Sequence, residues 1–215
     1  MKIIIVGDIH ADWYNLNKLI KNTKPDIILQ VGDFGYWPKF EQYSLKRIYN
    51  GDTQIFFCPG NHEDWDALDN IKSIEIAPNI FYMKKGTTLA LRDGRTVLFM
   101  GGAYSVDKDC RVEGKTWFPQ EIIYPEDIEN IKLDVIPDII ISHTCPEEFE
   151  MTGLQIFDKI HDPSRPILSQ LLKEYKPKEW YFGHWHEFKE GDYEGCKWMA
   201  LNESHSNDVW AVELK

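Results

Sequence analysis

The sequence predicts an α/β fold in which helices connect the strands of a parallel sheet. Short runs rich in Ile, Val and Phe alternate with segments whose apolar residues recur at helical spacing, which is typical of right-handed βαβ units. Several of these runs stop at a glycine that is followed by Asp, Asn or His. The chain has 215 residues, of which 43% are apolar, and its sequence contains no repeat, low-complexity tract or Pro/Ser linker. We therefore expect one domain over residues 1–215.

The first part of the chain has the clearest alternation of strands and helices. Apolar runs predict strands at residues 2–6, 27–31 and 54–58. Between them, apolar residues at helical spacing predict helices at residues 13–21 and 40–49. Asp12 directly precedes the first of these helices, where it suits the N-cap position.

The middle of the chain has a different pattern. Three closely spaced strands are predicted at residues 80–82, 87–91 and 96–100, and the turn through Asp93-Gly94 joins the last two in a hairpin. A long, weakly patterned stretch follows from residue 101 to about residue 119. Loops of that length are often functional.

The last part of the chain returns to the first pattern. A strand is predicted at residues 139–141, a helix at 166–175 and a further strand at 180–182. Residues 197–201 and 209–214 are expected to close the fold as a β pair.

Five short motifs follow five of the predicted strands. They are Gly7-Asp8-Ile9-His10, Gly32-Asp33, Gly60-Asn61-His62-Glu63, Ser142-His143 and Gly183-His184-Trp185-His186. Carboxylate and amide oxygens combined with imidazoles, converging from several strand ends, describe a site for two divalent metals. The i, i+2 spacing of Asp8 and His10 lets both side chains point the same way at a strand end, and His186 repeats this spacing after His184.

Each of these residues has an ordinary explanation when it is taken alone. Asp8 could cap a helix, although Asp12 suits that position better, and a single His could be a satisfied polar side chain. Asp33 stands at the end of the second strand, where it could place one oxygen on each of two ions about 3.5–4 Å apart. The set as a whole is better explained by metal binding.

Composition limits the partners. The formal net charge of −11 argues against broad nucleic-acid binding, whose affinity depends on Lys and Arg that neutralise phosphates. The apolar run at residues 3–6 is too short for a signal sequence or membrane span, so no membrane association is expected. Four cysteines stand apart without a CxxC pair, which favours free thiols and a cytoplasmic location; they are Cys58, Cys110, Cys145 and Cys196.

The ordered set D-x-H, GD, GNHE, H and GHxH resembles the calcineurin-like metallophosphoesterase superfamily, and the resemblance runs from residue 2 to residue 186. It implies a two-sheet β-sandwich built from βαβ units and flanked by helices, with metals at the strand C-termini. It also implies two divalent ions, with Mn foremost and Fe, Zn, Ni or Co as alternatives.

The same resemblance assigns roles to individual residues. One metal would take Asp8, His10, Asp33 and His186, and the second would take Asp33, Asn61, His143 and His184. A bridging hydroxide would attack phosphorus in line. His62 would give the leaving oxygen its proton; the alternative is an imidazole that only orients groups or binds substrate.

Two departures from the family motifs argue against the sub-family of protein serine/threonine phosphatases. Serine/threonine phosphatases of this superfamily carry Asp-Arg-Gly after the second motif and an Arg before the third, whereas here Phe34-Gly35-Tyr36 follows Asp33 and Pro59 precedes Gly60. The second half, over residues 77–82 and 164–186, is similar to the layout of the RNA lariat debranching enzyme. Debranching enzymes, however, have Cys where this chain has Asp8, and they prefer a basic surface.

The loop at residues 101–118 is expected to select the substrate. Lys108 and Arg111 could contact a phosphate, with Tyr104 beside them, although a solvated loop whose charges pair locally would look the same in sequence. Large aromatic residues in or beside the motif loops could stack a base or an aromatic leaving group, although large aromatic residues more often fill the core or its rim; they are Tyr36, Trp37, Trp65, Trp117 and Trp185.

The sequence thus predicts a cytoplasmic, metal-dependent hydrolase of phosphoester bonds that acts on a small or nucleotide-like substrate, as a phosphatase or as a phosphodiesterase. One alternative is a nuclease or debranching-type phosphodiesterase, which would need a basic surface stripe. Another is a partner-binding scaffold, a class that generally loses metal ligands or the catalytic His. The motifs do not specify an oligomeric state.

Overall fold

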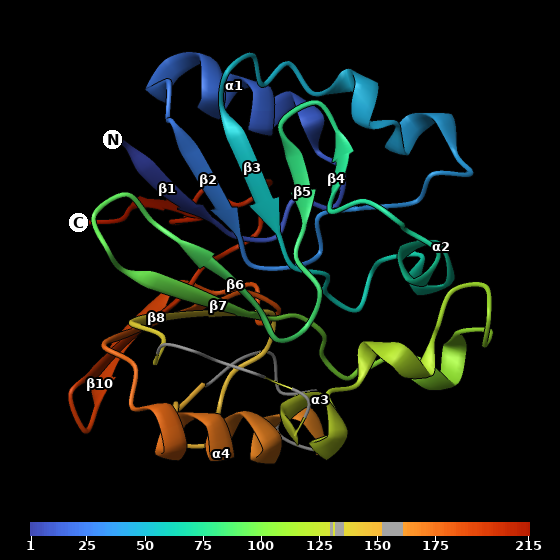
Figure 1. Ribbon diagram of the computed structural model, residues 1–215. Helices are drawn as coiled ribbons and strands as arrows, with labels where there is room; N and C mark the ends of the chain where they lie inside the picture. The colour runs from blue at the N-terminus through green and yellow to red at the C-terminus, as the bar shows by residue number, and fades with distance from the viewer. Residues whose placement is uncertain (130, 132–135, 152–160) are drawn as a thin grey trace.

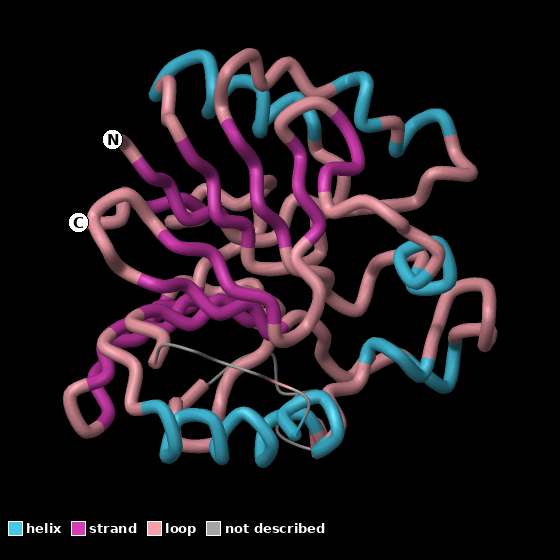
Figure 2. The backbone as a smooth tube through the Cα atoms, in the orientation of Figure 1, coloured by secondary structure: helices cyan, strands magenta, loops and turns pink. Residues whose placement is uncertain are grey.

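Two six-stranded sheets pack face to face, with helices on their outer faces (Figures 1 and 2). This computed structural model describes residues 1–129, 131, 136–151 and 161–215. Apolar side chains from both sheets form one cluster between them, including Ile5 and Leu29 from the first sheet and Phe99 and Ile141 from the second. The α/β two-sheet sandwich implied by the sequence is confirmed.

The first sheet contains the N-terminal strands. Its order is β12 (Ala211–Glu213), β1 (Ile3–Val6), β2 (Ile27–Gln30), β3 (Gln54–Phe57), β5 (Ile80–Tyr82) and β4 (Glu75–Ala77). The four inner strands run parallel, and β12 and β4 are antiparallel edges. Their carboxyl ends therefore meet at one edge of the sheet.

The second sheet contains the later strands. Its order is β10 (Lys189–Tyr193), β11 (Cys196–Ala200), β9 (Glu179–Phe182), β8 (Ile139–Ser142), β7 (Thr96–Met100) and β6 (Thr87–Ala90). Again the four inner strands are parallel and the two edge strands are antiparallel. The predicted hairpin through Asp93-Gly94 joins β6 to β7.

Both faces of the inner strands are covered, which explains their uninterrupted apolar runs. Ile3 and Ile5 face the second sheet, whereas Ile4 and Val6 pack with Leu16 of helix α1 (Trp13–Thr23). Asp12 caps α1 as expected, because its Oδ1 accepts a hydrogen bond from Asn15 N at 3.1 Å.

The outer face of the second sheet is covered in the same way. Ile140 packs with Leu168 and Leu171 of α4 (Ser164–Tyr175), and α3 (Pro125–Glu129) lies beside it (Figure 1). No helix among the ranges given above combines the length and apolar character that crossing a membrane requires.

The predicted helix at residues 40–49 is wrong. Two single 3₁₀ turns, Glu41–Tyr43 and Leu45–Arg47, are separated by Ser44 in an extended conformation (ψ 125°). Neither turn has a side-chain N-cap, and Ile48 is buried while Phe40 and Tyr49 are exposed. The apolar residues therefore never share one buried helical face.

The predicted closing β pair is also wrong. Residues 197–201 fall on β11, which lies between β9 and β10, whereas residues 209–214 contain β12, which pairs with β1 in the other sheet. The sequence prediction also missed β4, β10, α3 and the short helix α2 (Trp65–Asp69), none of which is longer than five residues.

Candidate metal centre

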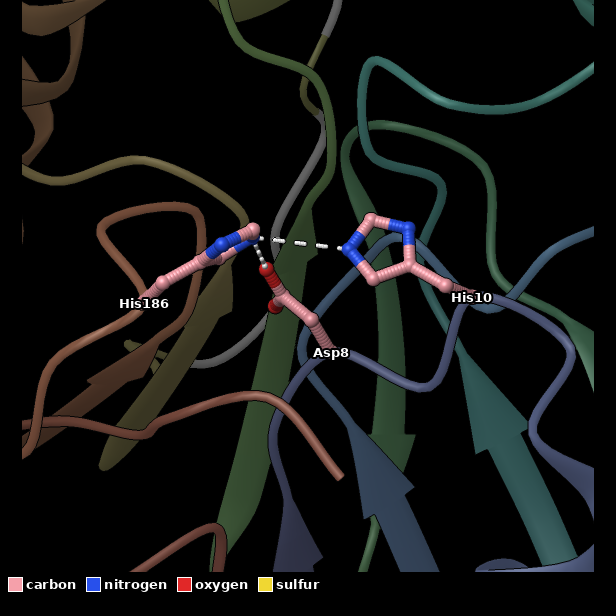
Figure 3. Close-up of side chains that lie close together, drawn as sticks. All are labelled: Asp8, His10 and His186. Atoms are coloured by element: carbon pink, nitrogen blue, oxygen red, sulfur yellow. Dashed lines mark hydrogen bonds and ion pairs between the residues drawn. The ribbon is translucent and has the colours of Figure 1, made fainter. Parts of the chain in front are cut away.

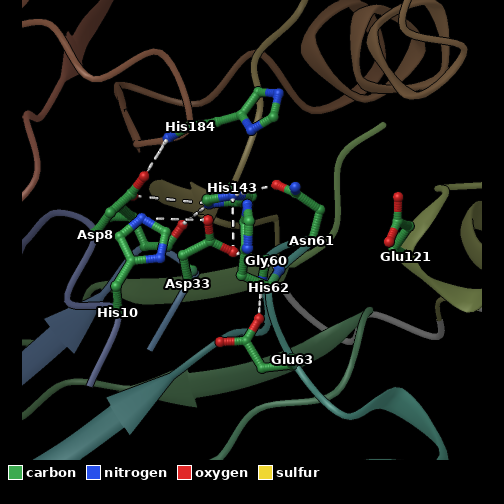
Figure 4. A network of polar contacts seen from close by, with 12 residues as sticks. Asp8, His10, Asp33, Gly60, Asn61, His62, Glu63, Glu121, His143 and His184 are labelled. Carbon is green, nitrogen blue, oxygen red and sulfur yellow. Dashed lines mark hydrogen bonds and ion pairs between the residues drawn. The ribbon is translucent and has the colours of Figure 1, made fainter. Parts of the chain in front are cut away.

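The five motifs converge where strand ends from the two sheets meet (Figure 4). Asp8, Asp33 and Asn61 follow β1, β2 and β3 of the first sheet, and His143 and His184 follow β8 and β9 of the second. All five are buried, and Asp8 and His143 have no exposed surface. The predicted site residues therefore lie together at the junction of the sheets.

One group of possible ligands contains Asp8, His10 and His186 (Figure 3). Nε2 of His186 lies 3.3 Å from Asp8 Oδ2 and 3.4 Å from His10 Nε2. One carboxylate oxygen and two imidazole nitrogens thus face one another, a donor set that suits a divalent transition metal.

A second group of possible ligands contains Asp8, Asp33 and His143, so Asp8 belongs to both groups. Asp33 also approaches the first group. Its Oδ2 lies 3.6 Å from His10 Nε2, and its Oδ1 lies 3.3 Å from His143 Nε2. Asn61 Oδ1 is 3.1 Å from the same His143 nitrogen. The two oxygens of Asp33 therefore face imidazoles of two different groups, which is the arrangement of a bridging carboxylate.

His184 contacts Asp8 through its backbone and His143 through its ring. Its backbone N donates to Asp8 Oδ2 at 3.0 Å, and its ring lies edge-on to His143 with centroids 5.0 Å apart. The structure thus brings all seven predicted ligands into one neighbourhood.

Four of these seven residues have a left-handed backbone, with φ between 48° and 69°: His10, Asp33, His184 and His186. That conformation is uncommon for residues other than glycine and costs free energy at each position. The side chains therefore meet through sharp turns after the strands. The i, i+2 spacing predicted their approach, but the backbone is not extended.

Two glycines make room for the carboxylates. A Cβ at Gly60 would overlap Asp33 Oδ1, and a Cβ at Gly183 would overlap Asp8 Oδ1. The Gly-Asn-His-Glu and Gly-His-x-His motifs begin with glycine because no side chain fits there.

The electrostatics of the centre fit cations. Burial alone would raise the pKa of Asp33, but the imidazoles of His143, His62 and His10 outweigh it and hold that pKa well below its ordinary value. For His143, burial opposes the charged form, and the carboxylates of Asp33 and Asp8 raise the pKa nevertheless. A buried centre that stabilises positive charge between two carboxylates, with nitrogen and oxygen donors around it, fits two divalent metals.

Glu63 has a role that the sequence did not reveal. Its Oε1 accepts from Gly35 N at 2.9 Å and its Oε2 accepts from Gly60 N at 2.6 Å, so it joins the loops after β2 and β3. Burial, followed by the charge of Asp33, raises its pKa to about 8. The only sequence signal was its place in the Gly-Asn-His-Glu motif.

His62 lies at the exposed side of the centre, beside Arg111. Nη2 of Arg111 is 2.8 Å from His62 Nε2, and Trp37 Nε1 donates to the carbonyl of His62 at 2.7 Å. His62 N donates to Asp33 Oδ1 at 2.8 Å, which ties the residue to the centre. The sequence did not predict this contact between the His62 imidazole and a cationic side chain.

The three predicted substrate residues separate in the structure. Arg111 contacts the Asn61-His62 segment, whereas Lys108 Nζ lies 4.3 Å from the ring centroid of Trp117 and 5.9 Å from that of Tyr104. Of the predicted stacking aromatics, Trp65, Trp117 and Trp185 are buried, and Tyr36 and Trp37 are partly exposed.

The fold and the centre together define a metallophosphoesterase α/β sandwich. The family model described as calcineurin-like phosphoesterase matches residues 1–188, and the chain belongs to this family. Membership implies phosphoester hydrolysis with divalent metals.

The chain is similar to two curated proteins named lariat debranching enzyme. The one from Schizosaccharomyces pombe is 26% identical, covering 86% of this chain and 48% of its own length; the one from Gallus gallus is 25% identical, covering 86% and 42%. The chain thus spans about half the length of the curated relatives it matches. The solved structure of TT1561 from Thermus thermophilus has the same fold, with a TM-score of 0.63, 17% identity, and coverage of 94% of this chain and 89% of that one.

Proposed function

We propose that this protein is a two-metal phosphoester hydrolase whose ions are held by the seven motif residues. The observation that carries the proposal is the position of Asp33, whose two oxygens face the imidazoles of two separate groups. One ion would contact Asp8, His10, Asp33 and His186, and the other would contact Asp33, Asn61, His143 and His184. When bound, such ions supply an acidified water as nucleophile and positive charge for the phosphoryl oxygens. Manganese is our first choice among Mn, Fe, Zn, Ni and Co.

His62 would donate the proton that the leaving oxygen requires. Its backbone N is held by Asp33 and its carbonyl by Trp37, and its ring contacts Arg111 at the exposed side of the centre. A positioned acid of this kind typically contributes about 10²–10⁴-fold in rate.

The substrate we propose is a small or nucleotide-like phosphoester. The net charge of −11 does not favour long nucleic acids.

Free thiols at Cys58, Cys110, Cys145 and Cys196 favour the cytoplasm. The shared core between the sheets supports one domain over residues 1–215.

A second candidate is a debranching-type phosphodiesterase, which is favoured by the 26% identity to the Schizosaccharomyces pombe enzyme. Hydrolysis of a branched RNA at a rate exceeding that of small diesters would support this candidate over the first. Activity confined to small esters would exclude it.

The proposal is tested by metal-stripped protein resupplied with Mn²⁺, assayed on bis-p-nitrophenyl phosphate and p-nitrophenyl phosphate. We expect metal-dependent turnover of at least one ester. His62→Ala should lower kcat by about 10²–10⁴-fold and leave Mn²⁺ binding intact. His205→Ala is a suitable control, because that side chain is exposed and pairs with Asp12. Metal binding without turnover on esters or on a nucleotide panel would favour a non-catalytic scaffold.

A further inference from the structure

Arg111 is the cation that the long loop after β7 delivers to the centre. Its Nη1 donates to the carbonyl of Asn61 at 2.9 Å, and its Nη2 lies 2.8 Å from His62 Nε2. Its Nε lies 2.7 Å from Asp107 Oδ1. The side chain is only 8% exposed, so these three contacts hold the guanidinium in one orientation.

The guanidinium has a donor to spare at this position. Of its five N–H groups, one faces Asp107, and the Nη1 pair faces the carbonyls of Asn61 and Thr116, the latter at 3.4 Å. Nη2 carries the remaining two N–H groups, and one of them points to His62 Nε2. Within the part of the chain that the structure describes, no acceptor is found for the second N–H group of Nη2. A planar fork with a donor left over, beside a proton-donating residue, suits an anionic phosphoryl oxygen.

The acceptor on His62 is weaker than a phosphoryl oxygen. Arg can only donate, so His62 Nε2 presents its lone pair to Nη2 in this arrangement. An anionic oxygen is a stronger acceptor than a neutral imidazole, and Nη2 would turn to it. His62 Nε2 would then be free to take up a proton from solvent, which it could pass to the leaving oxygen.

Asp107 makes the site sensitive to substrate charge. Its carboxylate neutralises the guanidinium, so the pair offers hydrogen bonds without net positive charge. A phosphomonoester carries up to two negative charges, and the second would be repelled by the nearby carboxylate. A phosphodiester carries one charge and avoids this cost.

We propose that Arg111 binds the phosphoryl group and that Asp107, as its positioning residue, makes the centre prefer phosphodiesters over phosphomonoesters. This inference rests on the proposed hydrolase function and names its substrate class. It assigns the site to the Asp107–Arg111 pair rather than to the neighbouring Lys108, whose amine stacks on Trp117.

The test compares kcat/KM for bis-p-nitrophenyl phosphate, a diester, with that for p-nitrophenyl phosphate, a monoester, using manganese-loaded protein. Asp107→Asn keeps the shape and removes the charge, and it should raise the monoester-to-diester ratio about 5–10-fold. Arg111→Ala should lower kcat/KM for both esters about 100-fold, and Arg111→Lys should recover only part of that loss because Lys lacks the fork.

The chain provides a matched control. Asp93 and Arg95 form a second Asp–Arg pair, also at 2.7 Å, in the turn between β6 and β7. That turn is at the opposite end of β7 from the loop that carries Arg111. Asp93→Asn and Arg95→Ala should leave both kcat/KM values within about twofold, as expected for a partly exposed pair at the other end of β7.

A binding measurement separates this inference from the proposed function. Metal-free protein is titrated with inorganic phosphate and followed by ³¹P NMR; Arg111→Ala should weaken binding at least about tenfold, while Arg95→Ala should not. The inference is overturned if the wild type is active and Asp107→Asn has the same monoester-to-diester ratio as the wild type. It is also overturned if Arg111→Ala has the same kcat/KM as the wild type. If the wild type hydrolyses neither ester and no member of a nucleotide panel, the hydrolase proposal fails, and phosphate binding then decides whether Arg111 is an anion site.

Discussion

The metal centre and the loop at residues 101–121 lie side by side but are built differently. Each proposed ligand of the candidate centre follows a parallel strand, and glycines, left-handed turns and Glu63 fix the turns that present these residues. The loop contains only two 3₁₀ turns, Lys108–Cys110 and Pro119–Glu121. Its position depends on single contacts, such as those of Arg111 with Asn61 and His62.

Because of this difference, we expect the centre to determine the reaction and the loop to determine the substrate preference. Sheet topology brings the strand ends together, and the short turns after the strands then present the side chains of the centre. The loop can change its sequence without disturbing the sheets, so it is the region where substrate preference can be set. Variants in the centre should therefore strongly lower activity or stability. Variants in the loop should instead change the substrate preference or the pH dependence of unfolding.

The largest effect is expected for Asp33→Asn. The change removes the charge that both groups of imidazoles face, so kcat/KM should fall by at least about 10³-fold. Steady-state hydrolysis of bis-p-nitrophenyl phosphate measures this. Asp26→Asn, at the opposite end of β2, makes the same chemical change and should have little effect. Comparable losses in both variants would contradict a special role for the strand end.

A large loss of stability is expected for Glu63→Ala. It leaves the backbone N–H groups of Gly35 and Gly60 buried without their acceptor and removes a fully buried side chain. Urea unfolding should show a decrease of about 3 kcal/mol in the free energy of unfolding. Glu63→Gln keeps one acceptor oxygen and should lose less. Equal stability of Glu63→Ala and the wild type would mean that the two loops are held by other contacts.

A smaller, pH-dependent effect is expected from Glu121 in the loop. Burial raises its pKa to about 7, and its Oε1 accepts from Ser105 N at 3.0 Å. A carboxyl whose pKa is raised on folding stabilises the protein at low pH, and this contribution is lost as pH rises from about 5 to 7. Glu121→Gln should therefore remove about 2 kcal/mol of the pH dependence of unfolding over that range.

The control for Glu121 is Glu113→Gln, an exposed residue of the same loop. Unfolding is measured in urea at pH 5, 6 and 7 for both variants. A pH profile of Glu121→Gln that matches the wild type would show that Glu121 titrates normally.

Much of the centre could be predicted from sequence because strand topology and motif position coincide. An apolar strand that ends at Gly-Asp or Gly-Asn-His places its next residues at the sheet edge wherever the strands are parallel. Asp8, Asp33, Asn61 and His143 were therefore predictable as neighbours. Nothing in their spacing, however, predicted the left-handed backbone of His10 or His186.

Contacts between loops could not be predicted in the same way. Arg111 reaches His62 across 49 positions of sequence, and neither residue lies on a regular element that would fix the other. The prediction of a closing β pair was wrong for a related reason. Residues 197–201 and 209–214 are close in sequence, but their partners β9 and β1 lie in different sheets, and periodicity carries no information on pairing partners.

Mn²⁺ binding decides whether the strand ends hold two metals joined by Asp33. Metal-stripped protein is titrated with Mn²⁺, and the bound ions are counted and examined by electron paramagnetic resonance. We expect two ions per chain with the exchange coupling of a pair about 3.5–4 Å apart, and loss of that coupling in Asp33→Asn. A single uncoupled ion in the wild type, or none, would contradict it.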